Sequence, residues 1–407
     1  MQEAVGCEKL KSYKGVMAHG VELFMLEPAL LGKEKKRVVN RLVTSILLAS
    51  VIGGATGCGN DNGGPGSPPP AGSSAATLQL QPVLSNLNFP VALAQTPDGR
   101  VLYNERLTGN VRIVAPQWQL LSTPFCQIAV ATSGEQGLLG LALDPNYAVN
   151  RFVYVYYTAS GPLRNRVVRY TESGGLCTNE TILLDNLPAN ANHNSGIIQF
   201  GPDGKLYVMT GDAQNQAAAQ DLTSLAGKML RINADGSDPV DNPFGANVNA
   251  NAKKVFSYGH RNSFGFTFHG LTGHLWQTEN GPTGNDEINR LVAGDNYGWP
   301  TVEGIAGNPA FHDPILAFTP SIAPTGIIAV PANTSVYPTD YGNNLLFVDF
   351  IEGKIRRVLL TGANLDQLGA TTVVYGGGNG GLLSLMLGAD GFIYVSNSSA
   401  IFRLLPQ

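Results

Sequence analysis

Short apolar runs, many of them alternating with polar residues, recur along most of this chain and are joined in pairs by tight turns. Alternation with a period of two is the pattern of a β-strand that has one face in a core. The turns contain glycine or asparagine, often as Asp-Gly, where φ can become positive. They lie at 97–99, 144–146, 202–204, 271–273, 341–343 and 389–391. The pattern therefore predicts six β-hairpins.

Each turn has strands of the same character around it. The strand after the turn alternates apolar residues with others, as in Phe152–Tyr157. The strand before the turn consists of small and aliphatic residues: Val91–Gln95, Leu138–Leu143, Gly196–Phe200, Gly265–Phe268, Gly326–Val330 and Leu382–Leu387. A third strand often follows: Asn110–Val114, Arg166–Tyr170, Lys228–Ile232 and Lys354–Leu359.

Six such units, about 50 to 70 residues apart, predict an all-β six-bladed β-propeller, in which repeated sheets surround an axis. A β-sandwich with long insertions is the alternative, and the regular period disfavours it. The first strand, Leu78–Val83, is expected to pair with the last blade near Ile401–Leu405 and close the ring.

In a propeller, the loops at one end of the ring form a central funnel, and the longer loops carry the site. The candidate loops are Asn190–Gly196, Asp212–Gly227, Tyr258–Asn262 and Glu279–Tyr297.

The composition agrees with this fold. Among 407 residues, 49 are glycine, 25 are proline and only 14% are charged, which suits short strands and tight turns better than long helices. The net charge is −4 and no basic patch is present, so nucleic acid is not an expected partner.

The pattern of the first 57 residues indicates an export signal rather than a part of the fold. A basic segment that ends near Arg41 precedes the apolar run Leu42–Ile52, and small residues follow up to Cys58. Ala55–Cys58 resembles a lipobox, so we expect a bacterial lipoprotein, periplasmic or at the cell surface, that contacts the membrane through a lipid on Cys58. A plain secretory signal is the alternative, and Met17 or Met25 is a candidate true start.

The next segment, residues 58–77, is rich in Gly, Ser and Pro and reads as a flexible tether. The propeller is therefore expected over residues 78–407. Inside it, only Cys126 and Cys177 are available for a disulfide, and an exported protein permits one. Two separate buried thiols are the alternative, and the sequence leaves both open.

Polar residues with distinct chemistry cluster in Val255–Pro300. Arg261 and Asn262 combine a fork of donors with an amide, which suits carboxylates and carbonyls, although an arginine that ties two blades together is the alternative. Gly281-Pro282 followed by Asp286 and Glu287 resembles a site for a hard cation such as Ca²⁺, which prefers carbonyl and carboxylate oxygens.

His193 lies in the loop Asn192–Gly196, directly before a first strand. Histidine exchanges a proton near neutral pH and serves as a general base. A lone histidine in such a loop is often only solvated. Its place before an inner strand predicts that it faces the funnel.

The chain contains seven motifs in this order: GLLGLALDP, HNSG, GPDGKLYVMTGD, GKMLRINADG, GHRN, ENGPTGNDEIN and NYGWP. Motifs of these kinds occur in the same order in one known family. Over roughly Asn88–Phe402 the chain resembles the soluble quinoprotein sugar dehydrogenases, the glucose/sorbosone dehydrogenase family. The resemblance implies oxidation of the C1 hydroxyl of an aldose by hydride transfer to pyrroloquinoline quinone (PQQ). It also implies Ca²⁺ and a separate electron acceptor.

The same resemblance assigns roles to residues. His193 matches the base, and Glu135, Asn192, Arg261 and Asn262 match positions against the cofactor. The carbonyls of Gly281 and Pro282 match the ligands of the cofactor's Ca²⁺. Glu287 and Tyr297 match a second, structural Ca²⁺ site, and Asp286 is a nearby acidic candidate.

Four positions depart from the pattern of the sugar-oxidising members. Ile351, Gly381 and Leu383 stand where these members have a Lys and two Arg that grip the PQQ carboxylates, and Ile197 stands where many have Arg. One alternative function is therefore a non-catalytic Ca²⁺-binding propeller that binds a glycan or a protein, as the hedgehog-interacting proteins do. A Ca²⁺-dependent lactonase-type hydrolase is another.

Overall fold

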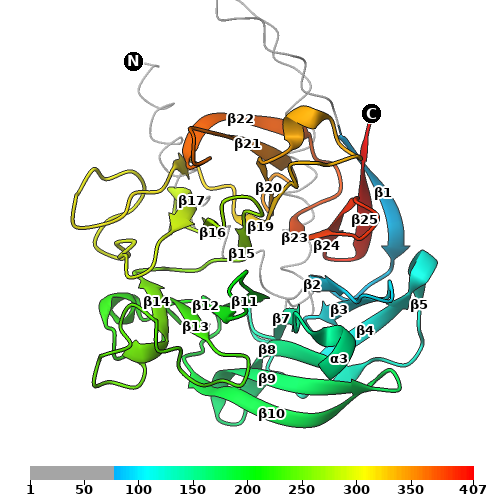
Figure 1. The fold of residues 1–407 in the computed structure, drawn as a ribbon, viewed down its shortest axis with the longest axis horizontal. Helices are drawn as coiled ribbons and strands as arrows, with labels where there is room; N and C mark the ends of the chain where they lie inside the picture. The colour runs from blue at the N-terminus through cyan, green and yellow to red at the C-terminus, as the bar shows by residue number, and fades with distance from the viewer. Residues whose placement is uncertain (1–77) are drawn as a thin grey trace, which may run out of the picture. The chain divides into compact units, whose positions relative to one another are not determined.

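The computed structural model describes residues 78–407, which form six β-sheets arranged around a central axis (Figure 1). Five sheets have four strands and one has five. The predicted all-β six-bladed propeller is therefore confirmed. The expected export signal, the tether and Cys58 lie outside the described residues.

The blades follow one another along the chain. Blade 1 contains β2 (Pro90–Gln95), β3 (Val101–Glu105), β4 (Asn110–Ala115), β5 (Gln119–Leu120) and β6 (Cys126–Gln127). Blade 2 contains β7 (Leu138–Leu143), β8 (Phe152–Ser160), β9 (Leu163–Ser173) and β10 (Leu176–Leu187). Blade 3 contains β11 (Ser195–Phe200), β12 (Leu206–Thr210), β13 (Lys228–Ile232) and β14 (Val255–Tyr258).

The second half repeats this plan. Blade 4 contains β15 (Gly265–Phe268), β16 (Leu275–Glu279), β17 (Asp286–Leu291) and β18 (Leu316–Phe318). Blade 5 contains β19 (Pro324–Ala329), β20 (Leu345–Asp349), β21 (Ile355–Thr361) and β22 (Gln367–Tyr375). Blade 6 contains β23 (Leu382–Leu387), β24 (Ile393–Asn397), β25 (Ala400–Pro406) and β1 (Leu78–Ser85). Helical turns are short: η2 (Pro116–Trp118), α3 (Tyr147–Asn150), η3 (Gln216–Gln220), η4 (Ala252–Lys254) and η5 (Thr339–Tyr341).

The ring closes where the two ends of the described chain meet. β1 pairs antiparallel with β25, with Leu78 opposite Pro406 and Ser85 opposite Ala400. The closure predicted from the sequence is therefore correct. The last blade takes its outer strand from the beginning of the domain, so the ring cannot open without breaking that strand pairing.

The first strand of each blade lies innermost, and these strands pack against one another around the axis (Figure 1). Small residues make this possible because there is little room near the axis. A Cβ on Gly140 of β7 would lie 2.2 Å from the carbonyl oxygen of Gly196 on β11. Glycine is required there for close approach of the strands.

The core lies between the blades. Alternating side chains of the middle strands interlock there, and Trp276, Tyr103 and Tyr154 are among the largest fully buried side chains on these strands. Leu139 of blade 2 and Leu206 of blade 3, for example, belong to one buried cluster. Stability of this kind depends on each blade having neighbours on both sides.

Cys126 and Cys177 form a disulfide, with their Cα atoms 5.4 Å apart. This decides between the two alternatives that the sequence left open. The bond joins β6 of blade 1 to β10 of blade 2, so it cross-links two neighbouring blades at their outer strands.

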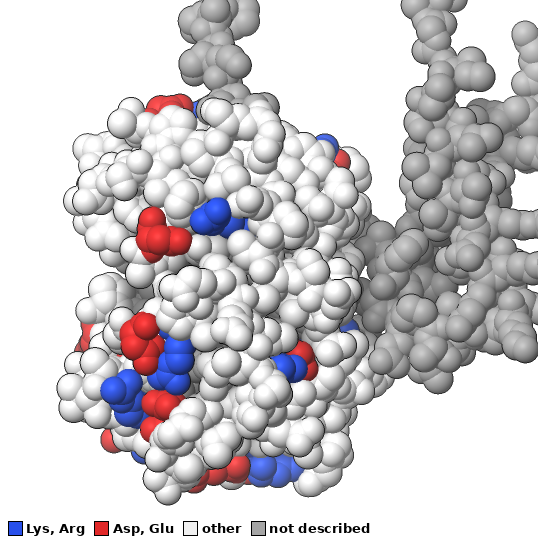
Figure 2. Space-filling model, turned by 90° about the vertical axis from the view of Figure 1, so that its right-hand side faces the viewer, with Lys and Arg blue, Asp and Glu red and all other residues white. Residues whose placement is uncertain are grey.

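Charged side chains of both signs are scattered in small groups over an otherwise uncharged face (Figure 2). Several of the charged groups on the molecule are ion pairs, such as Arg164 and Arg166 with Asp185. Among the described residues, no helix is long and apolar enough to cross a bilayer.

Candidate functional site

The antiparallel hairpin of blade 3 brings His193 and Asp212 together. Ser195 at the start of β11 is paired with Thr210 at the end of β12. His193 lies two residues before Ser195 and Asp212 lies two residues after Thr210, so the two residues meet at the end of the sheet. Nδ1 of His193 lies 2.7 Å from Oδ1 of Asp212.

The local backbone is specialised for this contact. His193, Ala213 and Gln214 all have a positive φ, of 60°, 50° and 61°, and clustered left-handed residues other than glycine commonly mark functional sites. A Cβ on Gly211 would lie 2.1 Å from the carbonyl oxygen of His193. Glycine at 211 therefore lets the two loops approach, and the Ala213 N–H donates to that carbonyl at 3.1 Å.

The contact also fixes the histidine tautomer. Asp212 is fully buried, and an ionised carboxylate only accepts hydrogen bonds, so Nδ1 of His193 carries the proton. The His193 side chain is 14% exposed, and its other nitrogen, Nε2, is left as an acceptor. This is the arrangement of a histidine base oriented by a carboxylate.

Glu135 connects the loops of three blades. Its Oε2 accepts from the backbone N–H of His193 at 2.7 Å and from Nδ2 of Asn262 at 3.1 Å. Asn262 is buried, and its Oδ1 accepts from the backbone N–H of Ser195 at 3.3 Å. Asn192 is half-buried beside Gly134, so the structure brings Glu135, Asn192, His193 and Asn262 together.

Arg261 lies next to this group. Its Nη1 donates to the carbonyl oxygen of Asn280 at 2.9 Å, and its guanidinium carbon lies 5.4 Å from the centre of the Trp299 ring. Its Nε is buried with no hydrogen-bond partner among the described residues. A buried unpaired donor on a cation is costly unless a ligand accepts from it. Arg261 therefore fits a ligand that carries carboxylate or carbonyl oxygens, as PQQ does.

The acidic residues of blade 4 divide between the two faces of β17. Glu287 lies opposite Glu279 across the β16–β17 pair, whereas Asp286 points to the other face. Burial and then the charge of Glu279 raise the pKa of Glu287 to about 7. Glu279 also contacts Nδ1 of His260, at 3.1 Å, and the backbone N–H of Arg261. Two buried carboxylates side by side favour a proton or a cation between them.

Asp286 and the Tyr297 hydroxyl already have partners within the protein. The Asp286 carboxylate accepts from the backbone N–H groups of Gly281, Ile322 and Ala323 at 2.8, 2.6 and 2.8 Å. Burial nevertheless raises its pKa. The Tyr297 hydroxyl donates to the Arg290 carbonyl at 2.6 Å. Tyr297 can therefore offer a cation only its backbone carbonyl.

In the described part of the chain, no three His, Cys, Asp or Glu side chains are grouped as a metal site. Gly281 is half-buried and Pro282 is exposed, in the loop between β16 and β17. Any Ca²⁺ there would depend on backbone carbonyls together with one or two carboxylates.

Within residues 78–407, blades 5 and 6 present no free cation to the funnel. Ile351 lies two residues after the end of β20, which is the position that Asp212 has after β12 in blade 3. Leu383 is the second residue of the inner strand β23. A Cβ on Gly381 would lie 2.5 Å from the Phe350 ring and carbonyl. The Lys and Arg residues in the described parts of these blades all bind other groups: Lys354 and Arg356 to Glu352, Arg357 to Asp340, and Arg403 to Gln81.

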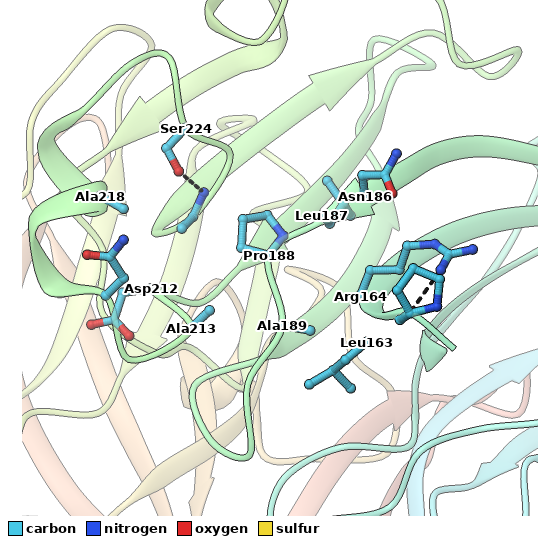
Figure 3. A pocket seen from close by; sticks show the side chains of 13 residues that line it. Leu163, Arg164, Asn186, Leu187, Pro188, Ala189, Asp212, Ala213, Ala218 and Ser224 are labelled. Atoms are coloured by element: carbon cyan, nitrogen blue, oxygen red, sulfur yellow. Dashed lines mark hydrogen bonds between the residues drawn. The ribbon is translucent and has the colours of Figure 1, made fainter. Parts of the chain in front are cut away.

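A cavity of about 390 Å³ lies beside Asp212. It is lined by residues 162–164 of the β8–β9 turn, 186–189 before β11, and parts of the loop 212–226 (Figure 3). Asp212 and Ala213 form part of its wall. Behind the wall, Nζ of the buried Lys228 lies 2.8, 2.9 and 2.6 Å from the carbonyl oxygens of Ala218, Ala219 and Ala226.

The sequence analysis gave no role to three members of the site, Asp212, Glu279 and Trp299, although Asp212 and Glu279 begin two of the candidate loops. Nε1 of Trp299 donates to Oδ2 of Asp212 at 2.8 Å, so the tryptophan belongs to the same hydrogen-bond chain. A carboxylate directly after a strand that pairs with the histidine loop was a usable signal for Asp212. Trp299 is 87 residues from Asp212 in sequence and gave no such signal.

Residues 87–404 match the glucose/sorbosone dehydrogenase family model. The chain belongs to this family. The chain is 37% identical to quinoprotein glucose dehydrogenase B of Acinetobacter calcoaceticus over 253 residues, which make up 54% of this chain and 52% of that protein. The match thus spans about half the length of that relative.

Solved structures of the family have the same fold. A glucose dehydrogenase-type oxidoreductase of Thermus thermophilus superimposes with a TM-score of 0.74 and 34% identity, covering 81% of this chain and 100% of that one. The PQQ-bound aldose sugar dehydrogenase of Streptomyces coelicolor gives 0.71 and 30%, covering 83% and 100%.

Proposed function

We propose that this protein is an exported quinoprotein sugar dehydrogenase that oxidises the C1 hydroxyl of aldoses. The His193–Asp212 pair carries the proposal, because it provides a base at the funnel end of blade 3. The membership of the family and the likeness to sugar dehydrogenases support the reaction class.

The chain's own residues account for the proton transfer. Nε2 of His193 accepts the proton of the C1 hydroxyl while hydride leaves C1. The Asp212 carboxylate, 2.7 Å from Nδ1, stabilises the imidazolium that results. When bound, PQQ supplies the ortho-quinone that takes up the hydride. A separate acceptor must then remove the two electrons.

Arg261 and Asn262 would hold PQQ, with Glu135 and Asn192 beside them. The unpaired Nε of Arg261 fits an acceptor on the cofactor. Asn262 is fixed by Glu135 and Ser195, so its position does not depend on a ligand. Because the described parts of blades 5 and 6 add no cation, the proposal relies on Arg261 as a positive charge for the PQQ carboxylates.

A Ca²⁺ ion is part of the proposal. The carbonyls of Gly281 and Pro282 would hold the ion at the cofactor, where a Lewis acid polarises a carbonyl group. Glu287 and the backbone carbonyl of Tyr297 would hold a second ion, and Glu279 opposite Glu287 adds a further carboxylate. Oxygen donors of this kind suit Ca²⁺.

The substrate and the location complete the proposal. The likeness to sugar dehydrogenases supports an aldose as the substrate, which must reach Nε2 of His193 at the funnel end of blade 3. We propose further that the protein acts outside the cytoplasm, attached to the membrane by a lipid on Cys58.

The test is reconstitution of the apoprotein with PQQ and Ca²⁺. We expect a quinone absorption band that changes when an aldose is added. His193→Ala should lower turnover by about 10²–10⁴-fold while PQQ still binds, because a positioned base contributes about that factor. His274→Ala is the matched control, since that histidine lies in the turn between β15 and β16, at the opposite end of blade 4 from the Arg261 loop. An unchanged rate in His193→Ala would remove the histidine from the mechanism.

Ile351, Gly381 and Leu383 replace the Lys and the two Arg expected at the PQQ carboxylates. Their lack of charge favours a second function, a Ca²⁺-binding propeller that recognises a glycan or a protein. Charge-assisted hydrogen bonds are worth about 1.5–3 kcal/mol each, so losing three of them would weaken a tricarboxylate site severely. If the wild-type protein does not bind PQQ even at high concentration with Ca²⁺, this second function replaces the dehydrogenase.

A further inference from the structure

We propose that Trp299 is a positioning residue for the base His193. Its indole N–H holds one oxygen of Asp212 so that the other oxygen stays on the histidine ring. The inference rests on the proposed function only in that His193 is the base. The hydrogen-bond chain itself is independent of any reaction.

The Asp212 carboxylate has a donor at each oxygen. Oδ1 receives Nδ1–H of His193 at 2.7 Å and the backbone N–H of Gln214 at 2.7 Å. Oδ2 receives Nε1–H of Trp299 at 2.8 Å. Both Asp212 and Trp299 are buried, with exposed fractions of 0% and 7%, so water cannot easily replace a lost donor. Without the indole N–H, Oδ2 would have no donor among the described residues.

That loss would act on the histidine. A carboxylate with one unsatisfied oxygen can rotate about its Cβ–Cγ bond to find another donor, and rotation moves Oδ1 away from Nδ1. Only the contact with Oδ1 requires the proton of His193 to sit on Nδ1. The indole N–H therefore protects the tautomer that leaves Nε2 as the base.

Trp299 is itself fixed to the neighbouring loops. Its backbone N–H donates to the Gly259 carbonyl at 3.0 Å, and its carbonyl accepts from Nε2 of Gln220 at 2.7 Å. The guanidinium of Arg261 lies over its ring. One indole ring thus sets both the orientation of the base in blade 3 and the position of the candidate cofactor cation before blade 4.

The charged groups around the pair are few. Glu135 accepts from the backbone of His193 rather than from its ring. Arg261 faces the ring of Trp299 and accepts the Asp212 backbone N–H with its carbonyl, at 2.8 Å. Neither of them bonds to the Asp212 carboxylate or to the His193 imidazole, so the indole N–H is the side-chain donor that controls Oδ2.

The alternative is that Trp299 only fills space, and Trp299→Phe separates the two roles. Phenylalanine keeps an aromatic ring for packing and for Arg261 but has no N–H. Trp276→Phe is a matched control because Trp276 is fully buried and its Nε1 has no hydrogen-bond partner among the described residues. With three tryptophans and six histidines in the chain, the indole and imidazole NMR signals can be assigned by substitution.

The experiment records ¹⁵N NMR signals of the histidine rings in the full apoprotein. Wild type and Trp276→Phe should show His193 with its proton on Nδ1 alone. Trp299→Phe should show a mixture of tautomers. If the wild type oxidises aldoses, Trp299→Phe should also lower kcat by about ten- to a hundredfold with KM for the sugar little changed, since small misplacements of a reacting group cost that much.

A folded Trp299→Phe variant that keeps the wild-type tautomer would overturn the proposal. If that variant does not fold, benzothienylalanine at position 299 replaces it, because this isostere keeps the shape of tryptophan and lacks only the N–H. The tautomer measurement needs no turnover. A wild type that fails to oxidise aldoses would therefore end the dehydrogenase proposal and leave this one standing.

Discussion

At the scale of single residues, the proposed chemistry of this protein depends on buried polar groups whose partners come from other loops. His193, Asp212 and Trp299 are the main example, and Glu135 with Asn262 is a second one, across 127 positions of sequence. Each group is useful because its partner holds it in one orientation. Their residue types were readable from the sequence, whereas their pairing was not.

Lys228 gives a prediction at this scale. Burial lowers its pKa from 10.5 to about 7, although three carbonyl oxygens lie within hydrogen-bonding distance of its Nζ. Between about pH 7 and 10.5 the unfolded chain therefore holds a proton that the folded chain has lost. The free energy of unfolding should then rise with pH across this window, by about 1 kcal/mol per pH unit from this group.

Urea unfolding of the wild type and of Lys228→Met at about pH 7, 8 and 9, inside that window, measures the effect. The difference between the two proteins should grow with pH, because only the wild type has the titrating amine. Lys354→Met, at a more exposed ion pair with Glu352, should leave the wild-type slope intact. Parallel pH profiles for the wild type and Lys228→Met would contradict the prediction.

At the scale of elements, the six blades share one plan but differ at the funnel. The position two residues after the second strand holds Asp212 in blade 3 and Ile351 in blade 5. The first strand of blade 6 begins beside Gly381, where Phe350 leaves no space for a side chain. The repeat therefore specifies the scaffold, whereas these few positions differ between the blades at the proposed cofactor site.

Introducing positive charges at the positions where blades 5 and 6 lack them tests whether these positions control PQQ binding. Ile351→Lys with Leu383→Arg should tighten PQQ binding by about tenfold or more, since charge-assisted hydrogen bonds are worth about 1.5–3 kcal/mol each. Equilibrium titration with PQQ in the presence of Ca²⁺ measures it. Leu359→Lys with Leu387→Arg adds the same charge at exposed positions away from the funnel end and should have little effect. Equal gains in both double variants would point to general charge rather than to a site.

The disulfide gives a second prediction for the elements. Cys126 and Cys177 are 51 residues apart, and removing such a cross-link typically costs about 2–5 kcal/mol because the unfolded chain gains freedom. Replacing both cysteines by serine should lower the free energy of unfolding by that amount. The wild type in reductant should behave like the variant. If reductant leaves the unfolding curve unchanged, blades 1 and 2 do not depend on the cross-link.

At the scale of the whole molecule, stability depends on closing the ring, because every blade packs between two others. The pairing of β1 with β25 closes it. A ligand that binds only the closed, folded ring adds to stability by mass action, by about 2.7 kcal/mol when it is a hundredfold above its Kd. Calcium bound in blade 4 should have this effect.

A chelator should therefore lower the melting temperature of the native protein. Glu287→Gln should abolish the difference between chelated and Ca²⁺-loaded samples, because it removes a charged ligand from the pair with Glu279. Glu303→Gln, at an exposed carboxylate in the nearby loop, should keep it. The same melting curve for native protein with and without chelator would mean that these carboxylates are held without calcium.

The sequence by itself determined the blades, because strand periodicity and turn chemistry are local. Asp-Gly turns and related turns between apolar runs located all six inner strands, and the motifs made His193, Glu135, Arg261 and Asn262 candidates for the site. The tertiary structure decided which distant groups meet. The disulfide between blades 1 and 2 spans 51 positions of sequence, and the bond from Trp299 to Asp212 spans 87. No local pattern encodes such pairs, because they follow from the order in which sheets pack around the axis.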